Sequence, residues 1–269
     1  MVKMVKLLPQ YAMMPFIGGI VMLGLSGYLL WRGLPLWLAL IVLVGGSALL
    51  YVLSLSYGVS EYQNRLAWLY QNLEPERFIE KFEKLLPRAK KYPVQEVTVR
   101  AHLANAYAAL GQFEKALELL DGVPDLSGAE ESEQVAAKLL VLNNKAQIYF
   151  QIEQADKGKA CLDELRATLP QATDALRKSY EENERILQCH YEALTGVCTS
   201  DAYLRTLLTE GSTALFRVNI SFLLARVYLS QGEKNMARSY MEETYEKGRD
   251  WLWPTQKAQE MMKEIPELN

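Results

Sequence analysis

The stretch "HLANAYAALGQFEKALELL", residues 102–120, decides how most of this chain folds. Apolar residues recur three and four positions apart on both sides of its glycine, which is the spacing of two amphipathic helices joined by a turn. Two later stretches, "KAQIYFQIEQADKGKACL" from Lys145 and "LARVYLSQGEKNMARSYM" from Leu224, keep the same register. In each stretch an alanine is followed by a tyrosine three positions later and by a second small residue twelve positions after the alanine. The three sets are Ala104, Tyr107 and Ala116; Ala146, Tyr149 and Gly158; Ala225, Tyr228 and Ala237. The chain therefore repeats a pair of helices.

The repeated pattern resembles the tetratricopeptide repeat, a helix–turn–helix unit of about 34 residues. Small residues let the two helices of a unit cross closely, and the tyrosine fills the gap above them. Two weaker copies lie around Tyr191 and in "LAWLYQNLEPERFIEKFEKLLP", so the resemblance covers roughly residues 60–250. The sequence departs from the family where Arg100, Lys145 and Ser221 replace apolar residues, and its tyrosines are 42, 42 and 37 residues apart.

The chain after residue 60 is predicted to be all-α. No segment there alternates with the period of a strand, and Pro and Gly separate candidate helices of 10 to 20 residues. We assign residues 59–250 to an α-solenoid of antiparallel helix pairs. Residues 251–269 are expected to form a capping helix, with Trp251 and Trp253 covering the open end of the stack.

Residues 1–58 are predicted to form a transmembrane helical hairpin. Two uncharged runs, at about 11–31 and 34–57, are each long enough to cross a bilayer as a helix. Arg32, Gly33 and Pro35 mark a tight turn between them. Glycines and other small residues should let the two helices approach closely. These residues are Gly18, Gly19, Gly24, Gly27, Gly45, Gly46, Ser47 and Ala48.

The distribution of charge predicts the sides of the membrane and excludes one class of partner. Lys3, Lys6 and Arg65 flank the hairpin, against Arg32 alone in its turn, so both termini and the repeats are expected in the cytoplasm, at the plasma membrane. The chain beyond the hairpin holds all 32 acidic residues but only 26 of the 29 Lys and Arg residues. This acidic balance argues against binding to nucleic acid.

The resemblance implies that the first helices of the pairs line a concave groove for a peptide. Carried over by position, the groove residues are His102, Asn105, Asn143, Asn144, Gln147, Arg185 and Arg226. Independently, asparagine is unfavourable inside helices, yet Asn105, Asn143, Asn144 and Asn219 stand in mid-helix. Their amides either contact a ligand or bond neighbouring helices and solvent. The Lys, Asn and Arg set of the family's carboxylate clamp is not matched.

No pattern of catalytic or metal-binding residues was found, and no cofactor is predicted. His102 and His190 are the two histidines, and neither has a metal-ligand neighbour at helical spacing. Cys161, Cys189 and Cys198 lack the CxxC spacing of a metal site and are expected to be core residues of a protein in a reducing compartment.

Three functions are compatible with the sequence. The first is a non-enzymatic, membrane-anchored scaffold that binds a protein or peptide in its groove. The second is a structural or assembly subunit of a larger membrane complex, in which the hairpin packs against other spans. The third is a membrane enzyme, which has the least support. Neither the identity of the partner nor the oligomeric state follows from the sequence.

Overall fold

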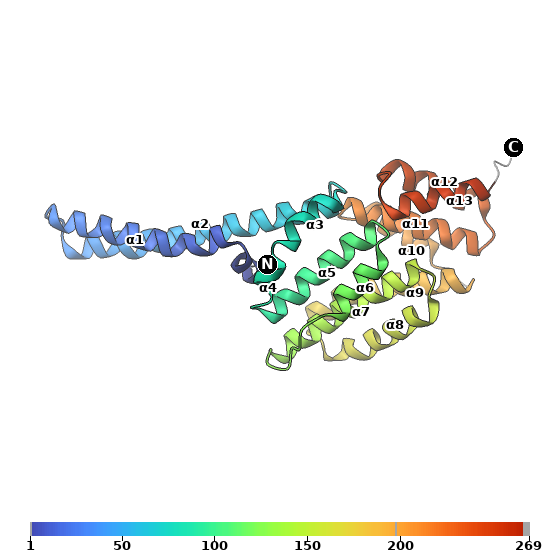
Figure 1. Cartoon of the computed structure of the whole chain (residues 1–269), viewed down its shortest axis with the longest axis horizontal. Helices are drawn as coiled ribbons and strands as arrows, with labels where there is room; N and C mark the ends of the chain where they lie inside the picture. Colours follow the sequence, from blue (N-terminus) through green and yellow to red (C-terminus); the bar gives the residue numbers. More distant parts are fainter. Residues whose placement is uncertain (1, 197, 266–269) are drawn as a thin grey trace. The chain divides into compact units, whose positions relative to one another are not determined.

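A computed structural model of the chain describes residues 2–196 and 198–265 (Figure 1). Across these residues the chain forms thirteen α-helices and two short 3-10 helices, and no strand. The helices divide into two compact units, Met1–Leu66 and Ala67–Asn269. The prediction of an all-α fold, with an apolar hairpin followed by successive packed helix pairs, is confirmed.

The first unit is built from two long apolar helices packed as a pair. A 3-10 turn, η1 (Val2–Leu7), precedes α1 (Pro9–Trp31), and α2 runs from Leu36 to Tyr70. Gly33 adopts a positive φ of 86° in the turn between them, which a side chain would disfavour. The second helix extends thirteen residues past the predicted span end at residue 57, because the following segment has neither Pro nor a further Gly beyond Gly58 until the helix has ended.

Glycines let the two helices approach, but only at certain positions. A side chain added at Gly18 would meet Leu50, its Cβ 2.8 Å from the leucine Cδ1, and one added at Gly46 would overlap Met22. Each of these glycines therefore accommodates a large side chain of the opposite helix. The expectation was wrong for four other positions, which have no described atom of another residue within contact range of an added Cβ: Gly19, Gly24, Gly27 and Gly45.

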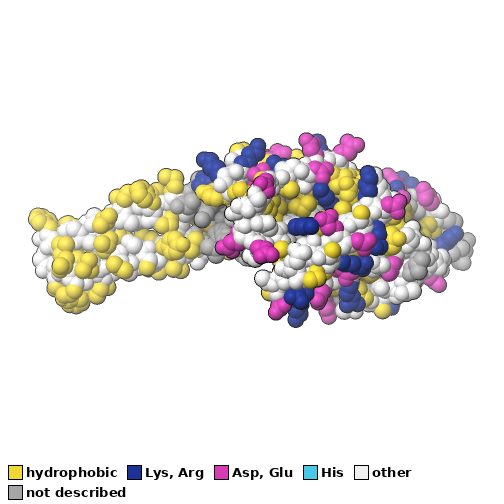
Figure 2. All heavy atoms as spheres, turned by 90° about the horizontal axis from the view of Figure 1, so that it is seen from below, with side chains coloured by type: hydrophobic (Ala, Val, Ile, Leu, Met, Phe, Trp, Pro, Cys, Tyr) yellow, Lys and Arg dark blue, Asp and Glu magenta, His cyan; other side chains and the backbone are white. Residues whose placement is uncertain are grey.

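The outer surface of the hairpin is apolar. Large hydrophobic side chains are exposed from Met13 to Tyr57, among them Phe16, Trp31 and Trp37. Figure 2 shows these side chains covering the hairpin, whereas Lys, Arg, Asp and Glu are interspersed over the helix pairs. Both helices are long and apolar enough to cross a membrane.

The second unit consists of successive packed helix pairs. Three of the pairs are α5 (Pro93–Ala109) with α6 (Phe113–Asp121), α7 (Glu131–Gln151) with α8 (Ala155–Thr168), and α11 (Ala214–Ser230) with α12 (Lys234–Lys247). The other elements are α3 (Pro75–Glu83), α4 (Leu86–Ala89), η2 (Leu169–Gln171), α9 (Asp174–Thr195), α10 (Asp201–Glu210) and α13 (Trp253–Glu264). Helix α9 packs on α7, α8 and α11, while α10 packs on α11, so α9 and α10 do not form a matching pair.

The three repeated stretches fold through the same turn. One residue in each turn has a positive φ: Gly111 (73°), Glu153 (61°) and Gly232 (80°). The next residue donates its backbone N–H to the carbonyl of the repeated tyrosine, at 2.9 Å in all three copies: Gln112 to Tyr107, Gln154 to Tyr149 and Glu233 to Tyr228. This six-residue bond is the Schellman arrangement that ends a helix. Residues that are aligned in the three sequence copies therefore take the same places in the three turns.

The small residues of the repeat lie where the paired helices touch. Ala116 and Ala237 are fully buried, and Gly158 stands against the ring of Phe150, 2.4 Å from an added Cβ to the nearest ring carbon. The buried side chains form three successive clusters, which run from α5 to α7, from α7 to α9 and from α9 to α13. The core is thus shared between neighbouring helix pairs.

The last helix joins the two ends of the row of pairs. The ring of Trp253 packs edge-on against Phe113 and Phe222, with centroids 5.2 and 5.4 Å apart. The indole N–H of Trp251 donates to the carbonyl of Leu73 at 2.9 Å. The expectation that these tryptophans cover an open end of the stack was therefore wrong. They contact the first pairs, because the row curves back until its ends meet.

We expect Gly158→Val to destabilise the second unit by about 1–3 kcal/mol, since the added methyl groups must displace the Phe150 ring in a packed core. The midpoint of thermal unfolding, followed by circular dichroism of the purified chain in mild detergent, measures the change. Gly128→Val is the matched control, because an added Cβ at Gly128 meets open space. Equal midpoints for the two variants would contradict the packing described above.

Candidate functional site

A cavity of about 340 Å³ lies between the first helices of the pairs. Its wall comes from the end of α2 at Tyr70, from α5, α7, α9 and α11, and from the turn before α11 at Ser212 and Thr213. The latter turn is attached to the end of α2 through Gln71, whose amide N–H donates to the carbonyl of Ser212 at 3.0 Å. The curvature of the row therefore places five helices around one space.

Carboxamides dominate the polar part of this wall. Seven Asn and Gln side chains line it: Asn105, Asn143, Asn144, Gln147, Gln151, Asn183 and Asn219. Among the residues that the structure places in the lining, none is Asp, Glu, Lys or Arg. Each carboxamide offers both a donor and an acceptor without carrying charge. The cavity is thus suited to groups that form hydrogen bonds and are themselves uncharged.

Asn105 belongs to a short chain of hydrogen bonds in the wall. Its amide donates to the hydroxyl of Tyr70 at 3.3 Å, and that hydroxyl lies 2.8 Å from Nδ1 of His102. Burial lowers the pKa of His102 to about 4 and raises the pKa of Tyr70 to about 12. The imidazole is therefore neutral. Its hydrogen bond positions the Tyr70 hydroxyl from the side away from the cavity. His102 itself does not line the cavity, although the sequence predicted it in the groove.

Asn143 and Asn144 line the cavity with different partners. The amide of Asn144 is buried and donates to the carbonyl of Ala101 on α5 at 3.4 Å, and Asn143 donates to the oxygen of Asn144 at 3.3 Å. Asn144 therefore links two neighbouring helices as well as bordering the cavity. Gln147, one turn further along α7, forms no hydrogen bond with its side chain in the described part of the chain.

The two predicted arginines lie away from the cavity. The guanidinium of Arg185 stacks on the ring of Tyr203, 3.8 Å from its centroid. Arg226 is buried, donates to the carbonyl of Phe150 at 3.1 Å, and has Glu153 at 3.6 Å. Carrying positions over from the repeat failed here, because α9 and α11 present other faces to the cavity than α5 and α7 do.

Sequence reasoning missed several lining residues, namely Gln151 on α7, Asn183 and His190 on α9, and Tyr70 at the end of α2. The mid-helix position had already marked Asn219 as a candidate ligand contact, and Asn183 carries the same signal inside a long polar helix. Gln151 and His190 gave no such signal, since the register of α9 against α7 becomes visible only once the row of helices is assembled.

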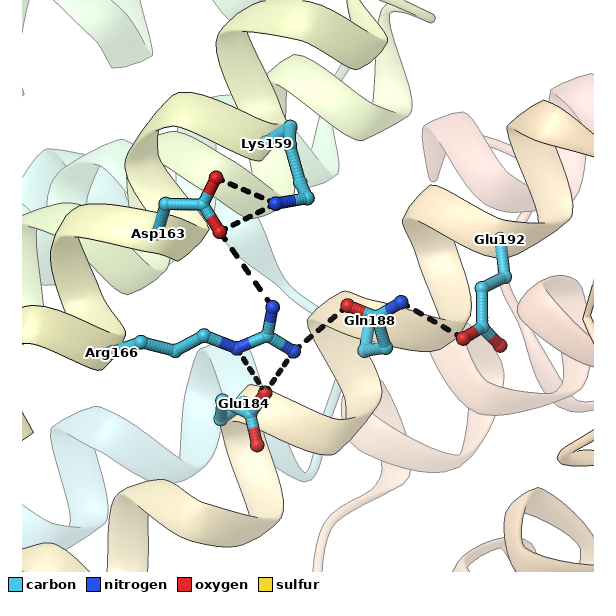
Figure 3. Close-up of polar contacts among 6 residues, drawn as sticks. All are labelled: Lys159, Asp163, Arg166, Glu184, Gln188 and Glu192. Carbon is cyan, nitrogen blue, oxygen red and sulfur yellow. Dashed lines mark hydrogen bonds and ion pairs between the residues drawn. The ribbon is translucent and has the colours of Figure 1, made fainter.

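A polar network outside the cavity fixes the rotation of α9 (Figure 3). Arg166 on α8 donates to Glu184 at 2.6 Å and to the oxygen of Gln188 at 2.8 Å. The amide of Gln188 in turn donates to Glu192 at 2.8 Å, and Lys159 and Asp163 extend the network along α8. Positions 184, 188 and 192 lie on one face of α9, the face that contacts α8. Asn183 and His190 lie on another face of the same helix, and that face borders the cavity.

His190 and Gln151 leave polar atoms without partners at the wall of the cavity. Nδ1 of His190 and Oε1 of Gln151 are buried and form no hydrogen bond in the part of the chain that the structure describes. The ring of His190 stacks on Phe150, with centroids 6.1 Å apart. Burial and then the nearby charge of Arg226 lower the pKa of His190 to about 3, so the imidazole is neutral.

Elsewhere, no three His, Cys, Asp or Glu side chains gather as metal ligands among the described residues.

Comparisons with protein-family models, with curated proteins and with solved structures found no match to this chain. The resemblance to the tetratricopeptide repeat thus rests on the repeated residues of the sequence.

The two buried histidines predict a loss of stability in acid. Their pKa values lie near 4 and 3 in the folded chain and near 6.5 in the unfolded chain, so the unfolded state binds more protons below pH 6.5. Stability is complete above this pH and falls as the pH drops towards 4. At pH 5 each histidine is expected to lower the free energy of unfolding by about 2 kcal/mol.

Thermal unfolding of the chain at pH 7.5 and pH 5 tests this expectation, with His102→Gln as the variant. The variant removes one of the two titrating groups, so its loss of stability between the two pH values should be smaller than that of the parent by about 2 kcal/mol. The same loss in both proteins would show that His102 titrates normally in the folded chain.

Proposed function

We propose that this chain is a non-enzymatic scaffold, anchored in the membrane by its hairpin, which binds a segment of a partner protein or a peptide. In this proposal the helix pairs are repeats of the tetratricopeptide type. They lie at the cytoplasmic surface of the plasma membrane and bind the partner there. The observation that carries the proposal is the uncharged, carboxamide-lined cavity between the first helices of the pairs.

The chemistry of the wall favours a polypeptide ligand. A peptide backbone presents alternating N–H donors and C=O acceptors, and a carboxamide pairs with both. Gln147, Asn183 and Asn219 make no side-chain hydrogen bond within the described chain, so their amides are free to pair with such a backbone. Leu187, Leu215 and Ile220 add apolar surface for side chains of the ligand. Pockets with this mixture of apolar wall and few polar groups are typical binding sites.

Binding of displayed peptides to the full chain in nanodiscs tests the proposal. We expect a peptide selected from a random library to bind the parent and to lose about tenfold in affinity in Asn183→Ala with Asn219→Ala, since each lost hydrogen bond contributes about 0.5–1.5 kcal/mol. Asn235→Ala is the matched control, because Asn235 is exposed on α12. Unchanged affinity in the double variant, or failure to select any peptide, would remove the binding role of the cavity.

The exposed apolar surface of α1 and α2 supports the membrane anchor. In water this continuous surface would drive aggregation, whereas the hydrocarbon of a bilayer accommodates it without cost. Lys3, Lys6 and Arg65 at the ends of the hairpin outnumber Arg32 in its turn, which favours cytoplasmic termini.

Extraction and protease mapping test the anchor and its orientation. The chain should stay in the membrane pellet at alkaline pH and dissolve only in detergent. Trypsin added to sealed inside-out vesicles should cleave at Lys90 and Lys91, which are exposed after α4, and should leave both of these sites uncut in right-side-out vesicles. Release at alkaline pH would contradict the anchor, and the reverse pattern of cleavage would contradict the orientation.

A second candidate function is a subunit of a larger membrane complex. Gly19, Gly24, Gly27 and Gly45 face away from the partner helix, with open space beside them. Small residues on an outward face let a further transmembrane helix pack closely. If this function holds, exchanging residues 1–58 for an unrelated two-span hairpin should abolish co-purification of the complex; retention of partners by the exchanged chain favours the first proposal.

A further inference from the structure

Two residues in the wall of the cavity, on the neighbouring helices α7 and α9, each have a polar atom without a partner in the described chain. Oε1 of Gln151 comes from α7 and Nδ1 of His190 from α9, and His190 is only 5 % exposed. A buried polar atom without a hydrogen bond is unfavourable by about 1–3 kcal/mol, and a ligand that pairs with it recovers this energy. Both residues line the cavity, so a ligand bound beside them can satisfy two polar groups that the chain itself leaves unpaired.

Charge excludes one broad class of ligands from this place. Arg226 is a cation whose charge acts on His190, but its guanidinium is engaged by the carbonyl of Phe150 and by Glu153, and it does not line the cavity. A ligand carboxylate would meet no cation in the described wall, and a ligand ammonium would meet no carboxylate. Burying an unpaired charge is strongly unfavourable, so the wall favours an uncharged group.

The donor and acceptor pattern narrows the group further. Gln151 Oε1 requires a donor, while Nδ1 of a neutral imidazole is a donor or an acceptor according to the tautomer. A primary carboxamide has two N–H donors and one carbonyl acceptor, so it satisfies both atoms in either tautomer. A hydroxyl has a single donor and satisfies both only when the imidazole donates. The neighbouring amide of Asn183 offers the same complementary pairing to the ligand backbone.

We infer that the cavity binds an uncharged peptide segment and that Gln151 and His190 together recognise an Asn or Gln side chain of that segment. This inference rests on the proposed function and adds the chemical class of the ligand. The volume of about 340 Å³ holds a few residues of extended chain and excludes a folded domain.

Peptides selected on the full chain in nanodiscs provide the probes. Each Asn or Gln of a selected peptide is replaced in turn by Asp or Glu and by Lys, and affinities are measured by fluorescence polarisation. We expect one position at which either charged residue weakens binding at least tenfold. The affinity of the original peptide should change less than about threefold between 50 and 500 mM NaCl, because no ion pair contributes to it.

A variant with reversed preference sharpens the test. In Gln151→Glu the carboxylate should pair with an ammonium, so the Lys-bearing peptide is expected to gain about tenfold over the Gln-bearing one. Gln154→Glu is the matched control: it makes the same substitution at the α7–α8 turn, outside the cavity, where the third copy of the repeat carries Glu233. The control should keep the preference of the parent.

The possible results separate the inference from the proposed function. Peptides that bind the parent through a charged residue, or whose preference is the same in Gln151→Glu and in the control, overturn the inference and leave the scaffold function in place. Failure to select any binding peptide overturns both. The comparison of Gln- and Glu-bearing peptides on the parent chain needs no variant, so it decides the matter even if Gln151→Glu does not fold.

Discussion

The contact of Trp253 with Phe113 and Phe222 is the constraint on which the second unit depends. It joins the turn of the first well-formed helix pair to helices more than 100 residues later, and Trp251 adds a hydrogen bond to Leu73. Gly111 lies beside this indole, 3.0 Å from an added Cβ, so the glycine required by the turn also makes room for the closing residue. An open row of the same helices would expose its amide-bearing faces to water.

Closure explains the electrostatic character of the cavity. Charged residues lie on the outer stripes of the helices, as in the Arg166–Glu184–Gln188 network that orients α9 (Figure 3). The inner stripes carry amides, hydroxyls and aliphatic side chains, and the histidine in the wall, His190, is neutral, as is His102 behind Tyr70. A space enclosed by five helices desolvates its wall, and carboxamides tolerate this better than ions do.

The local order of the fold could be predicted from the sequence, whereas its closure could not. The Ala–Tyr–small register located three turns correctly, since each turn depends on residues within about twenty positions of one another. Asn105, Asn143, Asn144 and Gln147 were predicted in the groove and line the cavity, because α5 and α7 share that register. Arg185 and Arg226 were predicted there too but do not line it, because the rotations of α9 and α11 are set by contacts with helices far along the chain. The glycines of the hairpin divide in the same way: Gly18 and Gly46 face the partner helix, and the pattern alone could not separate them from the others.

Crosslinking across the closure tests the central claim most directly. In a chain whose three cysteines are replaced by alanine, Gln71→Cys and Thr213→Cys stand on the two segments that Gln71 bridges through Ser212. A short bis-maleimide should link them within one molecule of the folded chain, as identified by mass spectrometry of the joined peptides, and Trp253→Ala should reduce the yield severalfold. A folded parent chain that yields no intramolecular link would show that the row of helix pairs is open.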